Sequence, residues 1–368
     1  MRGNVLGERF LVMSFGESHG RCVGVVIDGC PAGLELREED IQRELDLRKP
    51  SNTLVSTSRS EEDKVEILSG VFRDYTTGAP ICAIVWNRDV RSEDYEAIRH
   101  TPRPSHADYY AYVKYGGYND YRGGGRFSGR ITAGFVMAGA VAKKLLRKTL
   151  GIEIVGYALE IGGIRAENFS LEDARKFRYL NDVRAPTLES AEKMRSKILE
   201  ARKRGDSVGG IVECMATGLP IGLGEPVFDG LDCDLAKALM AIPGARGVEF
   251  GAGFKAAKMT GSQHNDPLTI RSGEIVSEKN DAGGVVGGLS TGMPLILRVV
   301  FKPPSSISIK QRTVNIKEMR EVELSVPGRH DPCIVPRAVP VVEAVTAIVL
   351  ADHAIRAGFI PPVLDKKV

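Results

Sequence analysis

The sequence predicts one large α+β domain, and three observations support this class. Strand-like and helix-like segments are mixed along the 368 residues, without the steady strand–helix alternation of a doubly wound sheet. Hydrophobic residues make up 43% of the chain and charged residues 26%, an ordinary globular composition that predicts a packed core. No linker rich in Ser, Pro or Gly divides the chain, so residues 1–368 are interpreted as a single domain.

The individual elements follow from hydrophobic periodicity. Strands are expected at Phe10–Ser14, Val23–Ile27, Val65–Val71, Ile81–Trp86, Val155–Ile161, Gly209–Met215 and Leu295–Phe301. Helices are expected at Glu38–Leu47, Ala107–Tyr115, Ser128–Leu150, Leu188–Arg204, Asp234–Ile242 and Ala338–Ala357. Gly151 and Gly358 follow two of these helices, where a glycine commonly ends a helix.

Charge, cysteine usage and hydropathy narrow the class of protein. A net charge of +3 is too small for a general polyanion binder, so any attraction for anions must come from local clusters. The cysteines show no CxxC pair and no zinc-ligand spacing, so we expect buried free thiols and no metal site.

The N-terminus lacks the apolar run of a signal peptide. The most apolar stretch, Ala338–Ala351, is too short to span a bilayer and contains Pro340 and Glu343. We therefore expect a soluble, cytoplasmic protein.

Two histidine-containing segments are candidates for chemistry. His19 lies in the segment GESHG (16–20), whose glycines allow a sharp turn that leaves the side chain open to a ligand. A histidine there can act as a general acid, although a turn histidine that only bonds a carbonyl remains an alternative. In RPSHAD (103–108), Ser105 can cap the following helix, whose N-terminal dipole favours an anion nearby, but a purely structural role leaves Arg103 and His106 unexplained.

The segment YRGGGRFSGR (121–130) is a glycine-rich loop that leads into a predicted helix. Such a loop presents backbone N–H groups to phosphate, and Arg122, Arg126 and Arg130 add forked donors. The pattern is neither the dinucleotide fingerprint nor a Walker loop. An anion site and a solvated basic loop both remain open.

Two further segments carry charge next to constrained backbone. KPPSS (302–306) follows a strand and offers a cation and two hydroxyls for a phosphate, although it can also be a plain strand exit. RHDPC (329–333) precedes the last predicted helix, and its carboxylate can accept a proton or form an ion pair. Together, the segments predict one loop-lined site that binds more than one anionic group.

These segments resemble the signature regions of the chorismate synthase family. The matching stretches include GESHGRCVGVVIDGCPAG (16–33), GGGRFSGRITAGFVMAGA (123–140) and RHDPCIVPRAVPVVEAV (329–345), with LRKP (47–50) and RPSHAD (103–108). The resemblance implies a lyase that converts 5-enolpyruvylshikimate 3-phosphate to chorismate and phosphate by an anti-1,4-elimination, the last step of the shikimate pathway. It also implies reduced FMN (FMNH2), used without net redox change. The implied assembly is a homotetramer of α+β subunits, each a β-α-β sandwich with helices between β-layers.

The resemblance also implies functions for individual residues. By position, His19 and His106 match two active-site histidines, one protonating reduced flavin and the other aiding departure of phosphate. Asp331 matches a residue that assists deprotonation at the flavin N5. FMN-contacting positions are Arg126, Ser128, Gly287, Lys302, Pro303, Ser305, Ser306 and Arg329. Positions that hold the substrate's phosphate and carboxylates are Arg48, Arg103, Arg130 and Arg337.

Three departures from the family pattern are left out of the predicted site. Leu54 stands where many members carry a ligand-contacting arginine, Phe127 replaces a small residue, and Pro243-Gly244 replace Asn-Ala. No flavin-reductase segment is evident, so an external reductant is expected, and direct NADPH binding is left open.

Two rival functions are kept. A module that stacks nucleic-acid bases on the tyrosines between 109 and 121 is disfavoured by the low net charge and by nearby acidic residues. A different flavin or phosphoryl enzyme on the same fold is the other alternative.

Overall fold

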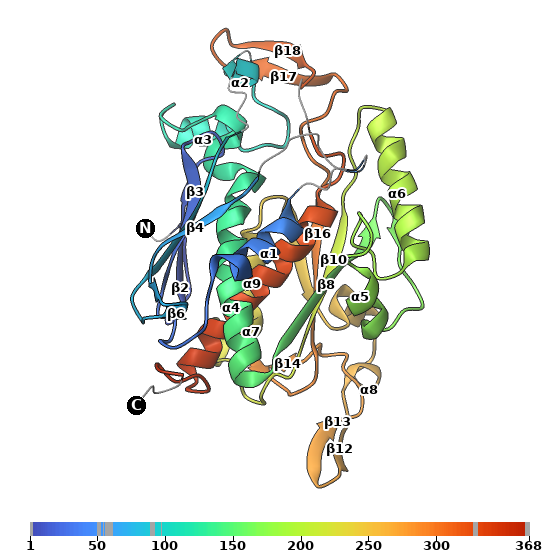
Figure 1. Cartoon of the computed structure of the whole chain (residues 1–368). Helices are drawn as coiled ribbons and strands as arrows, with labels where there is room; N and C mark the ends of the chain where they lie inside the picture. Colours follow the sequence, from blue (N-terminus) through green and yellow to red (C-terminus); the bar gives the residue numbers. More distant parts are fainter. Residues whose placement is uncertain are drawn as a thin grey trace.

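The computed structural model describes residues 3–49, 53, 55, 62–88, 93–96, 98–326 and 330–364. Within these residues, two five-stranded antiparallel sheets enclose a layer of helices (Figure 1). The chain is therefore the β-α-β sandwich of the α+β class that the sequence predicts.

The first sheet comes from the N-terminal part of the chain, and the second from the remainder. The first has the order β1 (Val5–Leu6), β2 (Leu11–Gly16), β3 (Cys22–Asp28), β7 (Ile81–Trp86) and β4 (Val65–Ser69). The second has the order β11 (Ala245–Phe250), β16 (Leu295–Phe301), β10 (Gly210–Thr217), β8 (Glu153–Ile161) and β9 (Ile164–Arg165). In β3 of the first sheet alternate side chains, such as Val23, Val25 and Ile27, are buried because one face packs on the helices, whereas β8 of the second sheet is buried along nearly its whole length because helices contact it from both sides.

Among the described residues, four helices lie between the sheets, and two more lie on the far side of the second sheet (Figure 1). The inner helices are α1 (Glu38–Arg48), α4 (Thr132–Leu150), α7 (Leu231–Met240) and α9 (Val335–Arg356), and the outer ones are α5 (Leu171–Phe177) and α6 (Leu188–Lys203). A Cβ built on Gly139 of α4 would lie 2.3 Å from the Cβ of Ala344 in α9. Glycine therefore lets the two central helices approach closely.

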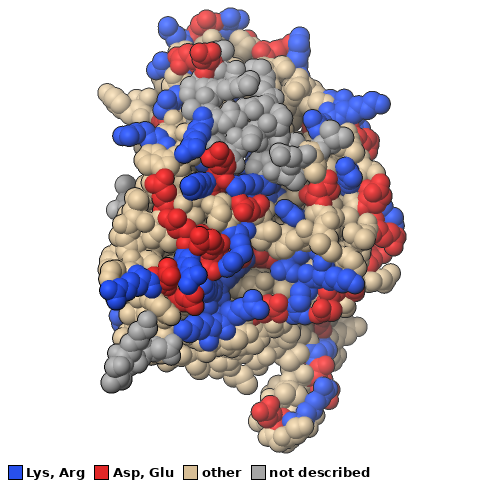
Figure 2. Space-filling model, in the orientation of Figure 1, with Lys and Arg blue, Asp and Glu red and all other residues tan. Residues whose placement is uncertain are grey.

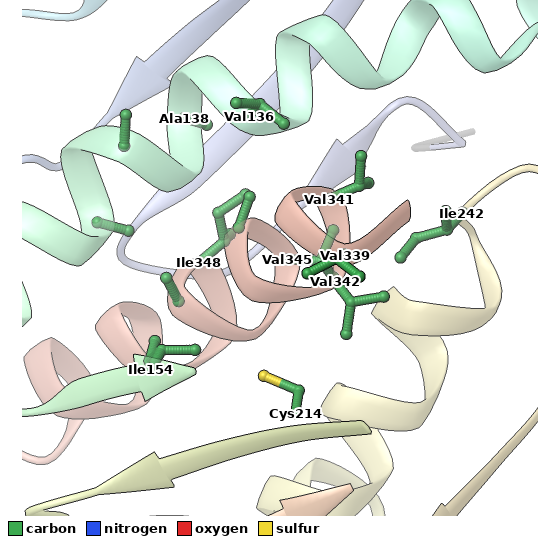
Figure 3. Close-up of a cluster of buried hydrophobic side chains, with 14 of the residues drawn as sticks. Val136, Ala138, Ile154, Cys214, Ile242, Val339, Val341, Val342, Val345 and Ile348 are labelled. Carbon is green, nitrogen blue, oxygen red and sulfur yellow. The ribbon is translucent and has the colours of Figure 1, made fainter. Parts of the chain in front are cut away.

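Helix α9 is the centre of the hydrophobic core. Its side chains Val339, Val342, Val345 and Ile348 lie between α4 and the strands that carry Ile154 and Cys214 (Figure 3). The helix is longer than the apolar stretch expected from the sequence: its 22 residues are enough to cross a membrane by length, but 94% of its most apolar window is buried inside the molecule. Such burial is what a core helix requires, because a helix that is apolar on all sides must be covered on all sides.

The remaining elements are short or peripheral. They are β5 (Val71–Phe72), β6 (Tyr75–Thr76), α2 (Glu93–Glu96), α3 (Asp108–Lys114), α8 (Gly261–His264), β12 (Leu268–Arg271), β13 (Glu274–Ser277), β14 (Val285–Val286), β15 (Leu289–Ser290), β17 (Gln311–Asn315) and β18 (Arg320–Leu324). The hairpins β12–β13 and β17–β18 project from the body (Figure 1).

All six cysteines are free, but only part of the burial prediction holds. Cys30, Cys214 and Cys333 are buried as expected. Cys22 and Cys82 are half-buried and Cys233 is exposed, because each of these positions faces away from the main core.

Candidate active site

A cavity of about 300 Å³ lies where the C-terminal end of α1 and the N-terminal ends of α4 and α9 meet the loop after β16. This arrangement brings together segments that are up to about three hundred residues apart in the sequence, as a loop-lined site requires. The predicted site residues that line it are Arg48, Arg103, His106, Ser128, Arg130, Lys302, Ser305, Ser306, Asp331 and Arg337.

The other predicted residues are placed differently. His19 is buried just behind the cavity wall, with its ring edge-on to Tyr95 at 5.1 Å between centroids, and Tyr95 itself lines the cavity. Pro303 is not among the lining residues, although its neighbours are. The β14–β15 turn, which contains Gly287, lies at the opposite end of the helical layer from the start of α9 (Figure 1). Arg329 and Leu54 lie outside the described residues.

The three arginines of the glycine-rich loop have different contacts. Arg126 donates to the carbonyl oxygens of Gly16 at 2.9 Å and Ser14 at 3.2 Å, so its guanidinium ties the loop to the first sheet. Arg122 pairs with Asp120. Of the three, only Arg130 lines the cavity. The sequence alone could not show which of these three arginines lines the cavity, because all three are the same residue type within one glycine-rich segment.

Asp63 orients two of the cavity arginines. Its fully buried carboxylate accepts from Arg48 Nη1 at 3.2 Å through Oδ2 and from Arg130 Nη1 through Oδ1. Burial alone would raise the pKa of Asp63, but Arg48 and Arg130 outweigh it and hold the pKa below its ordinary value. The carboxylate is therefore ionised and fixes both guanidinium groups. Sequence reasoning missed Asp63, which sits in a charged segment without any motif spacing.

The glycine loop packs against both candidate histidines. Gly123 has φ 59°, and a Cβ there would lie 2.4 Å from Cδ2 of His19. Gly124 has φ 84°, and its Cβ would lie 3.1 Å from Cε1 of His106. Two adjacent left-handed residues in such close contact require glycine, so the loop serves to bring the histidines together. Asn87 supports the same region, donating to the carbonyl of Gly20 at 2.9 Å.

His106 is held by a carboxylate in a single orientation. Its Nδ1 lies 2.6 Å from Oδ1 of Asp108, while Arg103 forms two hydrogen bonds to the same carboxylate at 2.8 Å. Arg103 Nη2 also lies 3.1 Å from Nδ1, but Asp108 is the nearer neighbour, so a proton on Nδ1 satisfies the shorter contact and leaves Nε2 to act on a ligand. Burial lowers the pKa of His106; Asp108 opposes this shift and the cation Arg103 adds to it. The imidazole is therefore neutral at neutral pH.

The loop after β16 faces this histidine. Lys302 Nζ donates to Ser305 Oγ at 2.7 Å and to the carbonyl oxygen of Ser105, and Arg103 Nη1 donates to Ser306 Oγ at 3.1 Å. Burial, with the nearby cations Arg246 and Arg103, lowers the pKa of Lys302. An anion placed here would relieve that repulsion.

The expectation that Ser105 caps the following helix is wrong. Ser105 adopts a left-handed φ of 56°, and α3 begins after Ala107 without any side-chain cap. Its carbonyl oxygen instead accepts hydrogen bonds from Lys302 Nζ and Ser305 Oγ. These bonds join the loop before α3 to the loop after β16.

Asp331 forms an ion pair at the start of α9. Its Oδ2 accepts from Arg337 Nη1, six residues further along the chain, at 2.6 Å. Arg337 Nε also donates to the carbonyl of Arg48 at 3.4 Å. The pair therefore links the last candidate carboxylate to the arginine cluster.

Part of the cavity lining is apolar. It includes Phe127 and Pro243-Gly244, three positions that depart from the family pattern and are not among the predicted site residues. Backbone and ring surfaces of this kind can cover a flat ligand. The other apolar lining residues are Ile242, Ile334, Ala338 and Val341.

Charge is arranged differently inside and outside the cavity. Among the described residues, five cations and two carboxylates line it, so it favours anions. On the described surface in Figure 2, basic and acidic side chains are interspersed. That mixture does not resemble the single-sign surface of a nucleic-acid binder.

An α+β sandwich with a cationic cavity, two histidines and a paired carboxylate defines an enzyme that acts on an anionic small molecule. The family model described as chorismate synthase matches residues 10–355. The chain belongs to the chorismate synthase family and is a lyase of the shikimate pathway.

Individual relatives agree with this family over their whole length. The chain is 57% identical to the chorismate synthase of Korarchaeum cryptofilum over 97% of this chain and 99% of the relative. It is 55% identical to that of Dehalococcoides mccartyi, over 99% of this chain and 100% of the relative. A crystal structure of chorismate synthase superposes with a TM-score of 0.76 and 30% identity, covering 95% of this chain and 93% of the other.

Proposed function

We propose that this enzyme converts 5-enolpyruvylshikimate 3-phosphate to chorismate and phosphate by an anti-1,4-elimination that uses reduced FMN. The observation that carries the proposal is the convergence of four guanidinium groups on one cavity, from Arg48, Arg103, Arg130 and Arg337. The substrate has a phosphate and two carboxylates, and forked, permanently charged donors suit such groups. Fixed cations also stabilise the charge that develops on the departing phosphate without reorganising.

The cavity residues fit a flavin phosphate and a flat ring. Lys302, with its lowered pKa, and the hydroxyls of Ser305 and Ser306 offer an anion grip on one side. Ile242, Pro243 and Gly244 offer an apolar wall. When bound, reduced FMN would supply electron density transiently to the substrate and regain it, so that the reaction has no net redox change. The chain's own residues hold the substrate, exclude water and move protons.

Three residues are proposed to move protons. His106, next to Lys302 and with Nδ1 held by Asp108, serves the flavin side of the cavity through Nε2. His19, against Gly123 and Tyr95, serves the departing phosphate. Asp331 would assist the deprotonation at the flavin N5, while its ion pair with Arg337 keeps the carboxylate oriented.

We also propose a cytoplasmic homotetramer that receives FMN reduced by a separate reductant. Support for self-association comes from the projecting β12–β13 hairpin, where Leu268, Ile270 and Ile275 are 74%, 73% and 65% exposed. Apolar side chains in that position favour burial against another copy. Because Gly287 lies far from the cavity of its own chain, any contact of this residue with FMN would be made in a neighbouring subunit.

An anaerobic assay tests the proposal. The full chain, given photoreduced FMN and 5-enolpyruvylshikimate 3-phosphate without NADPH, should form chorismate and release phosphate in equal amounts. Oxidised FMN under strict anaerobiosis should give neither product. Turnover with oxidised FMN, or none with reduced FMN, would contradict the proposed cofactor use.

A further inference from the structure

A partly buried ionic junction connects α1, α4 and α9, the three inner helices whose ends lie next to cavity arginines. Lys143 of α4 donates through Nζ to Glu44 of α1 and to Glu343 of α9, at 2.7 Å in each case. The cavity arginines lie at the ends of these helices: Arg48 is the last residue of α1, Arg130 lies just before α4, and Arg337 is in the first turn of α9. One ammonium group therefore joins all three.

Glu343, which is only 1% exposed, extends the junction to the second sheet. Its Oε1 accepts from the backbone N–H of Gly156 in β8 at 2.7 Å, and its Oε2 accepts from Tyr179 Oη at 3.0 Å. A Cβ on Gly156 would lie 2.8 Å from Cγ of Glu343, so glycine at this strand position makes room for the carboxylate. Arg178 approaches Oε1 at 3.4 Å.

Lys143 and Glu343 stabilise each other's charged form. Burial alone would lower the pKa of Lys143, but Glu343 and Glu44 outweigh it and raise the pKa above its ordinary value. Burial likewise would raise the pKa of Glu343, but Lys143 and Arg178 hold it below its ordinary value. Buried pairs of this kind contribute little net stability compared with apolar packing, and a better-attested use is to fix register.

The junction lies close to the point where α4 and α9 touch, Gly139 against Ala344. At about 1.5 Å per residue, it is roughly 6 Å along α1 from Arg48, 9 Å along α9 from Arg337 and 20 Å along the chain from Arg130. A small rotation or slide at the contact would therefore move the arginine-bearing helix ends relative to each other. A misplacement of about 1 Å at a reacting centre can cost on the order of 100-fold in rate.

We propose that Lys143, Glu44 and Glu343 are positioning residues, which set the register of α1, α4 and α9 and so hold the cavity arginines in the spacing that the substrate's anionic groups require. This inference rests on the proposed role of Arg48 in substrate binding. Arg184 acts alongside, donating to the carbonyl of Leu47 at 3.3 Å while its guanidinium lies over Tyr179 at 4.9 Å.

Glu44→Leu is the test variant, because it removes the link to α1 and leaves the buried Lys143–Glu343 pair intact. Glu39→Leu on the same helix is the matched control, since Glu39 is exposed. Glu44→Gln keeps an acceptor for Lys143 and should recover most of the loss. We expect Glu44→Leu to lower kcat/KM about tenfold, with a thermal midpoint within about 4 °C of the Glu39→Leu control.

A double-mutant cycle with Arg48→Ala separates positioning from general destabilisation. If Glu44 acts through Arg48, Glu44→Leu should cost little further kcat/KM in the Arg48→Ala background. An equal tenfold loss in both backgrounds, or a lower thermal midpoint with unchanged kcat/KM, would overturn the inference. If Arg48→Ala alone leaves kcat/KM unchanged, the proposed role of Arg48 fails and the inference fails with it. If Arg48→Ala is impaired but Glu44→Leu is not, only the inference fails.

Discussion

Asp331→Asn separates proton transfer from ligand positioning at the start of α9. The substitution keeps the size and the carbonyl acceptor of the side chain but removes its charge and its basic site. In the structure, Oδ2 of Asp331 accepts from Arg337 at 2.6 Å, so the variant also weakens the orientation of a cavity arginine.

The two roles predict different magnitudes. Replacing a charged hydrogen bond to Arg337 with a neutral one costs about 1.4 kcal/mol, or roughly tenfold in substrate affinity. Loss of a residue that moves a proton costs about 10²–10⁴-fold in turnover. We predict the second outcome in kcat, accompanied by a KM increase of no more than about tenfold.

Single-turnover kinetics with reduced FMN, together with a flavin titration, measure these quantities on one variant. Arg312→Gln, on a fully solvated hairpin residue whose side chain is 84% exposed, provides the control for loss of a charge elsewhere. Wild-type turnover at saturating substrate with weakened binding would refute a proton-transfer role and leave Asp331 as an anchor for Arg337.

Three further predictions follow from the geometry. His19→Ala and His106→Ala should each lower turnover by about 10²-fold or more, with the fold intact by circular dichroism; two near-wild-type variants would remove both residues from the chemistry. Gly123→Ala should impair turnover through His19, because its φ is 59° and the new Cβ would lie 2.4 Å from that ring; unchanged kinetics would show that the loop does not hold the histidine. Because the pKa of His106 is lowered in the ligand-free protein, an anionic substrate should raise it and binding should take up a proton near neutral pH. Calorimetry in buffers of different ionisation enthalpy measures that uptake, which His106→Gln should reduce; equal uptake by both proteins would exclude His106 as its source.

The elements that the sequence predicts well are those that build the core. Strands such as Ile81–Trp86 and Leu295–Phe301 have the predicted bounds, because their apolar side chains are buried on at least one face. Gly151 ends α4 in the left-handed conformation, as predicted. The hairpin β12–β13 was missed because its apolar side chains point to solvent, and β11 because Gly247 interrupts a short run.

The site was predictable where the interacting residues lie close together in the sequence. The segment at 103–108 contains both His106 and its orienting partner Asp108, although only the histidine was singled out. Asp63 could not be found, because its function depends on Arg48 and Arg130 meeting in three dimensions. Composition alone likewise could not show that Arg126 anchors the loop while Arg130 faces the cavity.

The four-arginine cavity is proposed to bind the phosphate-bearing substrate. The most direct test is the dissociation constant of 5-enolpyruvylshikimate 3-phosphate for Arg337→Met, measured by calorimetry with oxidised FMN so that no turnover occurs. Arg337 lines the cavity, whereas the control Arg312→Met alters a residue on an exposed hairpin. Loss of a charged hydrogen bond predicts a Kd roughly 10- to 100-fold higher for Arg337→Met, with the control unchanged. Equal affinity of the two variants would place the substrate elsewhere and contradict the account.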